Sequence, residues 1–533
     1  MRKVRVNQIG YKTAAEKYAV FADLDEDDRT FTVVEAETDK TVFEGTITKA
    51  KPYKVSGEYN SAGFFTEVTC PGKYKIVTAK GEESYVFEIG DKIYDKTLIN
   101  VFRVLYLQRC GIKLPEAYAK EFAHEACHNS PARIYGTDEK LDVNGGWHDA
   151  GDYGRYIVSG AKAVMDLFIA YEANPALFND AMNIPESGNG VPDILDEARY
   201  ELEWMFKMQD SKTGGVYHKV TGERFPGFVM PQHETWEMVV SPVSNTATAD
   251  FAAIMALSST VYKDIDTGFA NKCLGAAKKA FDYVVKHQDA PGFKNPDGIV
   301  TGEYPDDNCF DEIMWAAVEL YKVTEDESYA DVILSAYEKV TKWTILGWDD
   351  VGGYAAYSAL TSDLLKKNHL DFWTRLKSDF INQVDDMVDE AKANPYFISR
   401  TDTFEWGSNM SIADNGMILW MANKISPNQD YVIYMKYNLD YIFGINAVDY
   451  CFVTGEGSNS PVHPHHRPSA ALGKPMPGML VGGPDNGLHD ETAARLLADK
   501  APAACYIDHL DSYSTNEICV YWNSPLIALL AMC

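Results

Sequence analysis

The sequence contains no long apolar run. No stretch of the 533-residue chain is apolar over the length that a bilayer-spanning helix needs. Residues 1–5 lead directly into a strand-like segment, without the apolar core that a secretory signal requires. We therefore expect a protein that has no membrane partner and stays in the cytoplasm, or that is secreted only if a leader has been removed.

Basic residues are scarce relative to acidic ones. The chain holds 49 Lys and Arg against 78 Asp and Glu, a formal net charge of -29. A nucleic acid would be repelled over most of such a surface, so we expect no nucleic-acid partner. A neutral or cationic small molecule is a more suitable partner, and the oligomeric state is not indicated.

A paired cysteine pattern is also missing. The nine cysteines are scattered through the chain at irregular spacings. An odd and irregular set is typical of a reducing compartment rather than of a disulfide framework.

The chain is too long for one small domain, and its pattern changes near residue 90. Before that point, short segments rich in β-branched and aromatic residues alternate with turns such as residues 70–73, which predicts a small β-sandwich. The strand-like segments are residues 31–34, 41–43, 64–68, 74–77 and 85–89. This region has no cluster of titratable groups, so a scaffolding role is favoured over sugar binding.

After residue 91 the apolar residues follow helical spacing. One stripe contains Leu98, Val101 and Leu105, and Pro192 opens another. Further stripes lie within residues 251–255, 274–284, 313–321, 412–420 and 439–443. Many helices separated by long, aromatic-rich loops indicate an all-α toroid whose loops build a cleft at one end.

Residues 145–154, with the sequence GGWHDAGDYG, hold two carboxylates on a segment rich in turn formers. Only Ala150 and Gly151 separate Asp149 from Asp152. Two aspartates at this spacing can point into one space, where one holds a water molecule and the other deprotonates it. The alternative is an ordinary Asp-Gly turn at the surface.

Together with two later segments, this stretch resembles the signature of glycoside hydrolase family 9, the cellulases with an (α/α)6 barrel. The later segments are residues 453–457 followed by 463–469, and Asp508 through Glu517 to residues 523–525. Residues 6–11 resemble the start of the immunoglobulin-like module that precedes some of these barrels. The resemblance implies two domains: an all-β immunoglobulin-like sandwich at 1–90 and an all-α (α/α)6 barrel at 91–533.

The resemblance also implies an inverting hydrolysis. Asp152 takes the place of the general base, Asp149 that of its partner in holding the nucleophilic water, and Glu517 that of the general acid. Inversion needs the two working carboxyl groups about 6.5–9.5 Å apart. Asp508 would raise the pKa of Glu517 by like-charge repulsion. The alternative for Glu517 is an ordinary acid at a helix N-terminus.

His465 and Arg467 match the family's substrate-gripping His-x-Arg, where an imidazole and a guanidinium hydrogen-bond sugar hydroxyls. A metal site or a loop without function are the alternatives for this histidine-rich segment. Asp508 and Tyr513 complete the polar contacts to substrate. Trp406 is expected to be an aromatic platform for a pyranose ring, and Trp315 is equally consistent with a platform and with the core.

Four residues near the catalytic turn have the composition of a closed structural zinc site: two cysteines and two histidines. They are Cys110, Cys127, His128 and His148. Their spacing is not that of a zinc finger, and ordinary buried cysteines are the alternative. The resemblance implies that they bind Zn²⁺, and His148 would then anchor the neighbouring Asp149.

A second metal site is implied by the resemblance at Asp311, Glu312 and Asp350. Asp306, Asn308 and Asp349 lie close in sequence, and oxygen ligands from several short segments suit Ca²⁺. Acids that open a helix are the alternative.

The sequence therefore predicts a glycoside hydrolase that cleaves β-1,4-glucosidic bonds in soluble cello-oligosaccharides or β-glucan, of the cellodextrinase or endoglucanase type. One alternative is an exo-β-glucosaminidase acting on chitosan oligosaccharides, which the acidic balance would suit. The other is a non-catalytic oligosaccharide-binding protein.

Overall fold

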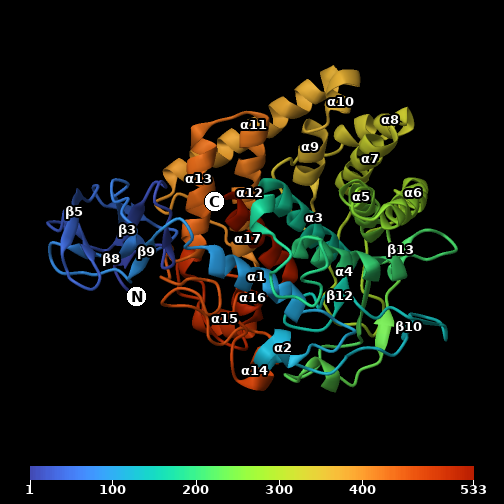
Figure 1. The fold of residues 1–533 in the computed structure, drawn as a ribbon, viewed down its shortest axis with the longest axis horizontal. Coiled ribbons are helices and arrows are strands. Elements are labelled where there is room, and N and C mark those ends of the chain that lie inside the picture. Colours follow the sequence, from blue (N-terminus) through green and yellow to red (C-terminus); the bar gives the residue numbers. More distant parts are fainter. The chain divides into compact units, whose positions relative to one another are not determined.

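The computed structural model describes residues 1–533 (Figure 1). The chain divides into two compact units. The first unit consists of residues 1–104, 385–423 and 427–533. The second consists of residues 105–384 and 424–426. The predicted domain boundary at residue 90 stays a prediction, although the last strand of the N-terminal region ends at Ile89 and the first helix begins at Asp95.

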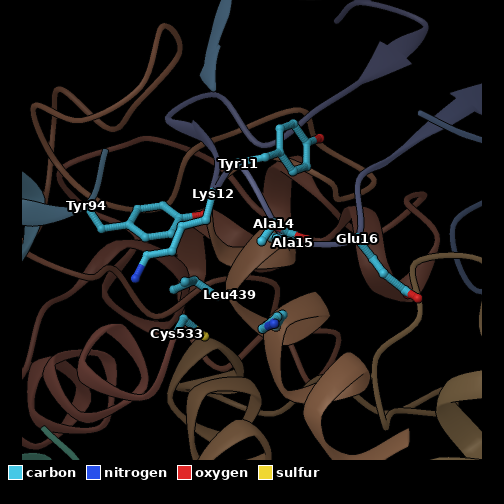
Figure 2. A pocket seen from close by; sticks show the side chains of 10 residues that line it. Tyr11, Lys12, Ala14, Ala15, Glu16, Tyr94, Leu439 and Cys533 are labelled. Atoms are coloured by element: carbon cyan, nitrogen blue, oxygen red, sulfur yellow. The ribbon is translucent and has the colours of Figure 1, made fainter. Parts of the chain in front are cut away.

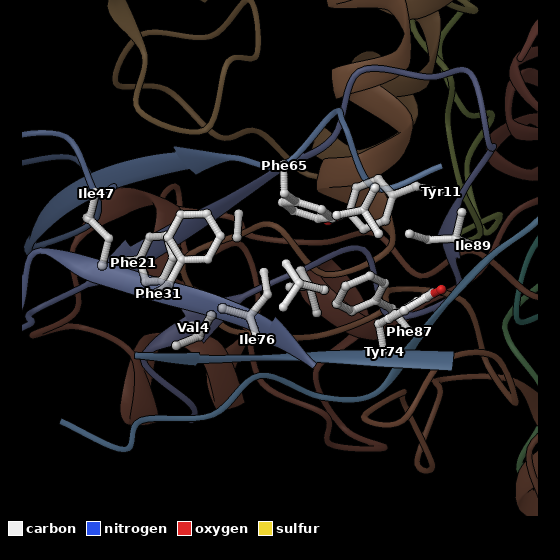
Figure 3. Packing of buried hydrophobic residues seen from close by; sticks show 14 residues of the cluster. Val4, Tyr11, Phe21, Phe31, Ile47, Phe65, Tyr74, Ile76, Phe87 and Ile89 are labelled. Carbon is white, nitrogen blue, oxygen red and sulfur yellow. The ribbon is translucent and has the colours of Figure 1, made fainter. Parts of the chain in front are cut away.

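The first unit begins with a β-sandwich of two sheets, as the sequence predicts. Their strand orders are β1-β3-β7-β6 and β2-β9-β8-β4-β5. The strands are β1 (Val4–Arg5), β2 (Gly10–Tyr11), β3 (Tyr18–Ala22), β4 (Thr30–Glu35), β5 (Thr41–Thr46), β6 (Lys51–Tyr53), β7 (Glu58–Phe64), β8 (Gly72–Thr78) and β9 (Phe87–Ile89). The core is rich in aromatic rings, among them Phe21, Phe31 and Phe65 (Figure 3).

One predicted strand is wrong in its position along the chain. The sequence predicts a strand over residues 64–68, whereas β7 ends at Phe64 and a turn follows, closed by a 3.0 Å hydrogen bond from the Val68 amide to the Phe65 carbonyl. Phe65 and Val68 both reach the sandwich core. The apolar residues of this run are therefore buried by a turn, which the strand pattern does not distinguish.

The remainder of the first unit is largely helical. Its helices are α12 (Ser408–Ile425), α13 (Gln429–Ile442), α14 (Arg467–Leu472), α15 (Glu491–Leu496), α16 (Tyr513–Asn516) and α17 (Val520–Met532). The sandwich contacts the end of α13: the Gln8 amide donates to the Phe443 carbonyl at 2.9 Å, and Asn7 Nδ2 donates to Asp440 Oδ1 at 2.7 Å. The N-terminal module is thus bonded directly to a helix of this unit.

A cavity of about 130 Å³ lies at this contact (Figure 2). Its lining comes from the sandwich loop after β2, from the residue before the first helix, from α13 and from the chain end, and includes Lys12, Glu16, Tyr94, Asp440 and Cys533. Burial raises the pKa of the Asp440 carboxyl to about 7. The bond from Asn7 and the charge of Lys436 oppose this rise.

The second unit is built on helices that pack around α5. The elements are α2 (Glu116–Ala119), α3 (Ile157–Ala173), α4 (Asp193–Met208), α5 (Asn245–Val261), α6 (Thr267–His287), α7 (Phe310–Thr324), α8 (Glu327–Tyr337), α9 (Gly352–Leu360) and α10 (Asp363–Asn368). Helix α5 contacts α3, α6 and α7, and α7 contacts α8 and α9. Helices α1 (Asp95–Leu107) and α11 (Leu370–Ala393) contribute residues to both units, as does α12 with its last two residues.

Short strands precede α3 and α5. They form a sheet of order β11-β10-β15-β14-β12 and a pair β13-β16. The strands are β10 (Ala132–Ile134), β11 (Lys140–Leu141), β12 (Arg155–Tyr156), β13 (Val216–Tyr217), β14 (Lys219–Gly222), β15 (Met238–Val240) and β16 (Val243–Ser244). Strand β12 continues directly into α3, so the sheet fixes the start of that helix.

Trp315 belongs to the core. Its side chain in α7 is fully buried and lies 5.5 Å, between ring centroids, from Tyr354 of α9. Its interpretation as a sugar platform is therefore wrong.

No helix of the structure combines the length and the apolar character needed to cross a membrane. The cytoplasmic location stays a prediction.

Candidate active site

The turn that carries Asp149 and Asp152 is held by backbone bonds on both sides. The Cys110 amide donates to the Gly146 carbonyl and the His148 amide to the Gln108 carbonyl, both at 2.7 Å. Gly146 has φ +74, and a Cβ there would meet the Trp204 ring at 2.7 Å. Only glycine fits this position, so the turn is packed directly onto α4.

The two aspartates of the turn differ in their hydrogen bonds. Asp149 accepts from Ser159 Oγ and from the Tyr304 hydroxyl, each at 2.5 Å, so both of its oxygens are engaged. Asp152 Oδ2 accepts only from the Gly154 amide at 3.0 Å. Asp152 therefore keeps one oxygen for a water molecule or a substrate.

Both aspartates are buried, and burial shifts the pKa of Asp149. Asp149 and Asp152 are 2% and 6% exposed. Burial raises the pKa of Asp149 to about 7, while the bonds from Ser159 and Tyr304 oppose the rise and the charge of Asp152 adds to it.

Three residues around the aspartates belong to no motif that can be recognised in the sequence. Ser159 lies in the first turn of α3, Tyr304 precedes α7 in a loop, and Lys219 begins β14. Lys219 is fully buried, and its charge lowers the pKa of Asp149. A serine, a tyrosine and a lysine at scattered positions give no local signal; only the fold brings them together.

In the first unit, Glu517 is attached to the histidine segment. His465 and Glu517 form a parallel β-bridge, and the His465 amide donates to the Asn516 carbonyl at 2.8 Å. On the other side the Gly482 amide donates to the Glu517 carbonyl at 2.9 Å. The structure thus brings together two predicted site segments that lie 52 residues apart in sequence (517 minus 465).

The histidine segment ends where α14 begins. The side chain of His466 caps that helix by accepting from the Ser469 amide, and Arg467 is its first residue, 5% exposed. His465 Nδ1 lies 2.6 Å from the Leu510 carbonyl, so Nδ1 carries the hydrogen and donates. This bond fixes the orientation of the imidazole ring.

The contacts of Asp508 differ from those expected of a substrate-binding residue. Its carboxylate accepts from the amides of Val462 and His463, both at 2.8 Å, and from Asn516 Nδ2 at 2.9 Å. These donors all belong to the protein. Asp508 therefore joins the histidine segment to the segment that carries Glu517, and its contact with substrate stays a prediction.

Exposed aromatic rings line up beside Glu517. Trp406 is 42% exposed, and its ring centroid lies 5.2 Å from that of Tyr513. The ring of Tyr513 lies 5.9 Å from that of His465. His489, which sequence reasoning missed, lies parallel to Trp406 at 6.4 Å. These rings form a surface on which sugar rings can stack.

The four predicted zinc ligands converge in the second unit. The ligand atoms of Cys110, Cys127, His128 and His148 all lie within 4.8 Å of one another. The Cys110 sulfur is 3.4 Å from His128 Nδ1, and the Cys127 sulfur is 3.8 Å from His148 Nε2. A tetrahedral zinc site has ligand pairs about 3.3–3.8 Å apart, so these residues fit the ion.

Two electrostatic features also suit a zinc ion. His128 Nε2 lies 3.1 Å from Glu234 Oε2, which is the carboxylate contact typical of a metal-bound histidine. Burial raises the pKa of the Cys110 thiol, but the hydrogen bond from Cys127 and the charges of Arg155 and the two histidines place it well below its usual range. A thiolate is the form that binds metal.

The predicted calcium ligands lie in a buried acidic cluster. Asp311 and Glu312 are 8% and 0% exposed at the start of α7, and Asp250 of α5 is 1% exposed. No N–H or O–H donor of the protein contacts the carboxylate oxygens of Asp250 or Glu312. Burial, followed by the charge of Asp311, raises the pKa of Asp350 to about 7. Asp250 lies far from the other members in sequence, so no local pattern could have found it.

Two family models match this chain. The model described as Glycosyl hydrolase family 9 matches residues 94–530, and the one described as Cellulase N-terminal ig-like domain matches residues 1–83. Together with the carboxylates on their positioned loops, these matches define a glycoside hydrolase with an N-terminal immunoglobulin-like module. The chain belongs to glycosyl hydrolase family 9.

Similar proteins extend over the whole chain. A cellodextrinase of Butyrivibrio fibrisolvens is 38% identical over 554 residues, covering 100% of this chain and 99% of its own. Endoglucanase D of Acetivibrio thermocellus is 34% identical, covering 99% of this chain and 83% of its own.

Solved structures are also similar to this chain over its whole length. A mutant thermostable endoglucanase from Alicyclobacillus acidocaldarius has a TM-score of 0.91 at 36% identity, covering 100% of this chain and 99% of its own. A zinc-binding triple mutant of the family 9 endoglucanase J30 has a TM-score of 0.92 at 30% identity, covering 98% and 99%. The predicted fold, an immunoglobulin-like sandwich followed by an all-α (α/α)6 barrel, is confirmed.

Proposed function

We propose that this enzyme cleaves β-1,4-glucosidic bonds in soluble cello-oligosaccharides with inversion of the anomeric configuration. The observation that carries the substrate class is the full-length similarity to the cellodextrinase of Butyrivibrio fibrisolvens. The endoglucanases among its relatives and structural neighbours support the same bond type. None of the comparisons cited favours a glucosaminidase or a non-catalytic sugar-binding protein.

Asp152 is the general base in this proposal. An inverting base must accept a proton from a water molecule on the face of the sugar opposite the leaving group. The oxygen of Asp152 that accepts no protein hydrogen bond is suited to that water. Asp149 shares the water with it, and its carboxylate is held in place by Ser159 and Tyr304.

Glu517 is the general acid, and it protonates the leaving glycosidic oxygen. Glu517 belongs to the first unit and Asp152 to the second.

In this proposal the substrate is bound by the aromatic and basic side chains next to Glu517. Trp406 and Tyr513 offer exposed faces for pyranose rings. In this proposal Arg467 donates to a sugar hydroxyl and His465 Nε2 accepts from one, because the hydrogen of the neutral imidazole lies on Nδ1, which donates to the Leu510 carbonyl.

We infer that a structural Zn²⁺ is bound by Cys110, Cys127, His128 and His148. These four ligands would complete the coordination of the ion. The four residues come from three separate segments of the chain. Cross-linking them would fix the start of the catalytic turn, because His148 precedes Asp149. The two thiol and two imidazole donors support the assignment.

We also infer that the acidic cluster holds Ca²⁺. Buried carboxylates without donors repel one another and are costly unless a cation neutralises them. Asp311, Glu312 and Asp350 would be ligands, together with Asp250. Addition of Ca²⁺ to chelator-treated protein should raise the thermal unfolding midpoint, and Glu312→Gln should remove the increase. An unchanged midpoint on Ca²⁺ addition contradicts the site.

Product analysis tests the proposed function most broadly. The enzyme is incubated separately with cello-oligosaccharides of two to six glucose units, soluble β-glucan and glucosamine oligomers, and the products are separated by size. We expect cleavage of the cello-oligosaccharides and no cleavage of the glucosamine oligomers. The reverse preference would contradict the proposed substrate.

A further inference from the structure

A buried lysine stands next to the catalytic aspartates, and nothing in the hydrolysis described above uses it. Lys219 is fully buried in β14, where it is the register partner of Tyr156 in β12. Strand β12 begins three residues after Asp152. The lysine therefore arises from the strand beside the one that continues the catalytic turn.

The ammonium group of Lys219 contacts three oxygens of one segment. Nζ donates to the Gly302 carbonyl at 2.5 Å, to Asn295 Oδ1 at 2.6 Å and to Thr301 Oγ1 at 3.4 Å. These oxygens satisfy all three donors of an ammonium. A buried charge is tolerated only with such compensation, so the loop of residues 293–304 is organised around this group.

The neighbouring residue binds the same loop. His218 is fully buried, its Nε2 lies 3.2 Å from the Glu303 carbonyl, and its ring stacks on Phe293 at 3.7 Å. Two consecutive side chains, from the residue before β14 and from its first residue, thus hold both ends of the loop.

The loop ends at Tyr304, the residue that donates to Asp149. The ring of Tyr304 also lies 4.7 Å from that of Tyr156. A loosened loop would displace the Tyr304 hydroxyl from the carboxylate. Displacements of about 1 Å in a positioning group can cost about 100-fold in rate.

Lys219 also interacts electrostatically with the two aspartates. Burial lowers the pKa of Lys219 to about 7, while the charges of Asp152, Glu303 and Asp149 oppose this fall. The ammonium and the carboxylates of the two aspartates therefore attract one another electrostatically. The charges that oppose the fall are thus those of three carboxylates, and the titratable ring of His218 lies beside them.

We propose that Lys219 is a positioning residue of this active site, whose buried ammonium ties residues 295–302 to β14 and keeps a positive charge within reach of Asp149 and Asp152. This inference rests on the proposed function, since it takes Asp152 as the base. It assigns a task to a residue outside the three signature segments of the sequence.

Three substitutions separate the two effects. Lys219→Met removes the bonds and the charge, Lys219→Gln keeps two donors without the charge, and Lys219→Arg keeps the charge. We expect kcat for cellotetraose to fall about 10- to 100-fold in Lys219→Met with a smaller change in KM. The acid limb of the kcat profile should move up by about one pH unit in Lys219→Met and Lys219→Gln, and stay in place in Lys219→Arg.

Lys17 provides a matched control. It is a fully buried lysine of the β-sandwich, and its Nζ donates to the carbonyls of Thr13, Ala15 and Thr66. Lys17→Met should leave kcat and the acid limb unchanged. If Lys219→Met does not fold, the Gln and Arg variants decide the question by the position of the acid limb.

Two outcomes overturn the inference: wild-type kcat in Lys219→Met, or a reduced kcat with an unmoved acid limb in both uncharged variants. Asp152→Asn is measured in the same series. If Asp152→Asn is active, the proposed base is wrong; if it is inactive while the Lys219 variants behave as wild type, only the role of Lys219 fails.

Discussion

The hydroxyl group of Tyr304 donates a hydrogen bond to Oδ2 of Asp149 over 2.5 Å, although 155 residues separate the two in sequence. Ser159 occupies the other carboxylate oxygen. Asp149 is thus held on both sides, whereas one oxygen of Asp152 accepts no hydrogen bond from the protein.

Tyr304→Phe tests this arrangement, because it removes one hydrogen bond to a charged group. Such a bond contributes about 1.5–3 kcal/mol, which corresponds to a loss of about tenfold to a hundredfold in kcat. Steady-state kinetics on cellotetraose measure it. Tyr135→Phe is the control: its hydroxyl donates to the Asp297 carbonyl at an exposed position, and kcat should not change. Equal kcat in Tyr304→Phe and wild type would remove Tyr304 from the site.

The zinc cluster predicts one Zn²⁺ per chain by elemental analysis. Cys110→Ser should lose the ion and lower the thermal unfolding midpoint by about 5 °C or more, because the ion cross-links three segments. Cys273→Ser is the control, since Cys273 is equally buried in α6 and belongs to no ligand cluster. Purified protein without zinc, whose stability does not respond to a chelator, would contradict the site.

Asp508→Asn distinguishes the two assignments of this residue. The structure predicts a loss of about 1–3 kcal/mol in stability, because amides of the histidine segment lose a charged acceptor. A contact with substrate would instead raise KM and leave the unfolding midpoint unchanged. Thermal unfolding and KM are compared with those of Asp511→Asn, an exposed neighbour.

Asp440 makes stability depend on pH. Its pKa is raised to about 7 in the folded protein by burial and is about 3.9 in the unfolded chain. The folded state therefore binds more protons between these values, and the contribution of this group falls as pH rises from about 4 to 7. The slope is at most about 1.4 kcal/mol per pH unit.

Asp440→Asn should remove this part of the pH dependence, so that variant and wild type differ more in stability at pH 8 than at pH 4. Unfolding in urea at both values measures the difference. Asp371→Asn, at an exposed position of α11, should show no such difference. A constant difference between Asp440→Asn and wild type at all pH values would contradict the assignment.

The sequence predicts the parts of this molecule that leave a local pattern. Amphipathic stripes identify α1, α4, α5, α6, α7, α12 and α13. Helices α3 and α17 have no such stripe: residues 157–170 of α3 are all buried, and α17 is apolar all round with Pro525 inside it. Periodicity cannot distinguish such a helix from a buried strand.

The residues of the candidate site likewise form two groups: those that belong to sequence motifs and those that only the fold brings together. Asp149, Asp152, Glu517 and the histidine segment belong to motifs, so the family resemblance identifies them. Tyr304, Lys219 and Asp250 are brought to the site or to the acidic cluster by contacts that only the folded chain creates. Asp508 is in a motif, but its role depends on which donors surround it, and the sequence does not contain that information.

The stereochemistry of the first product tests the central claim most directly. Proton NMR follows the anomeric signals while wild-type enzyme cleaves cellotetraose, with Asp152→Asn and Glu517→Gln measured alongside. The account predicts that the α-anomer forms first and that both variants lose at least about 1000-fold in kcat. Initial formation of the β-anomer, or turnover by Asp152→Asn at the wild-type rate, would contradict it.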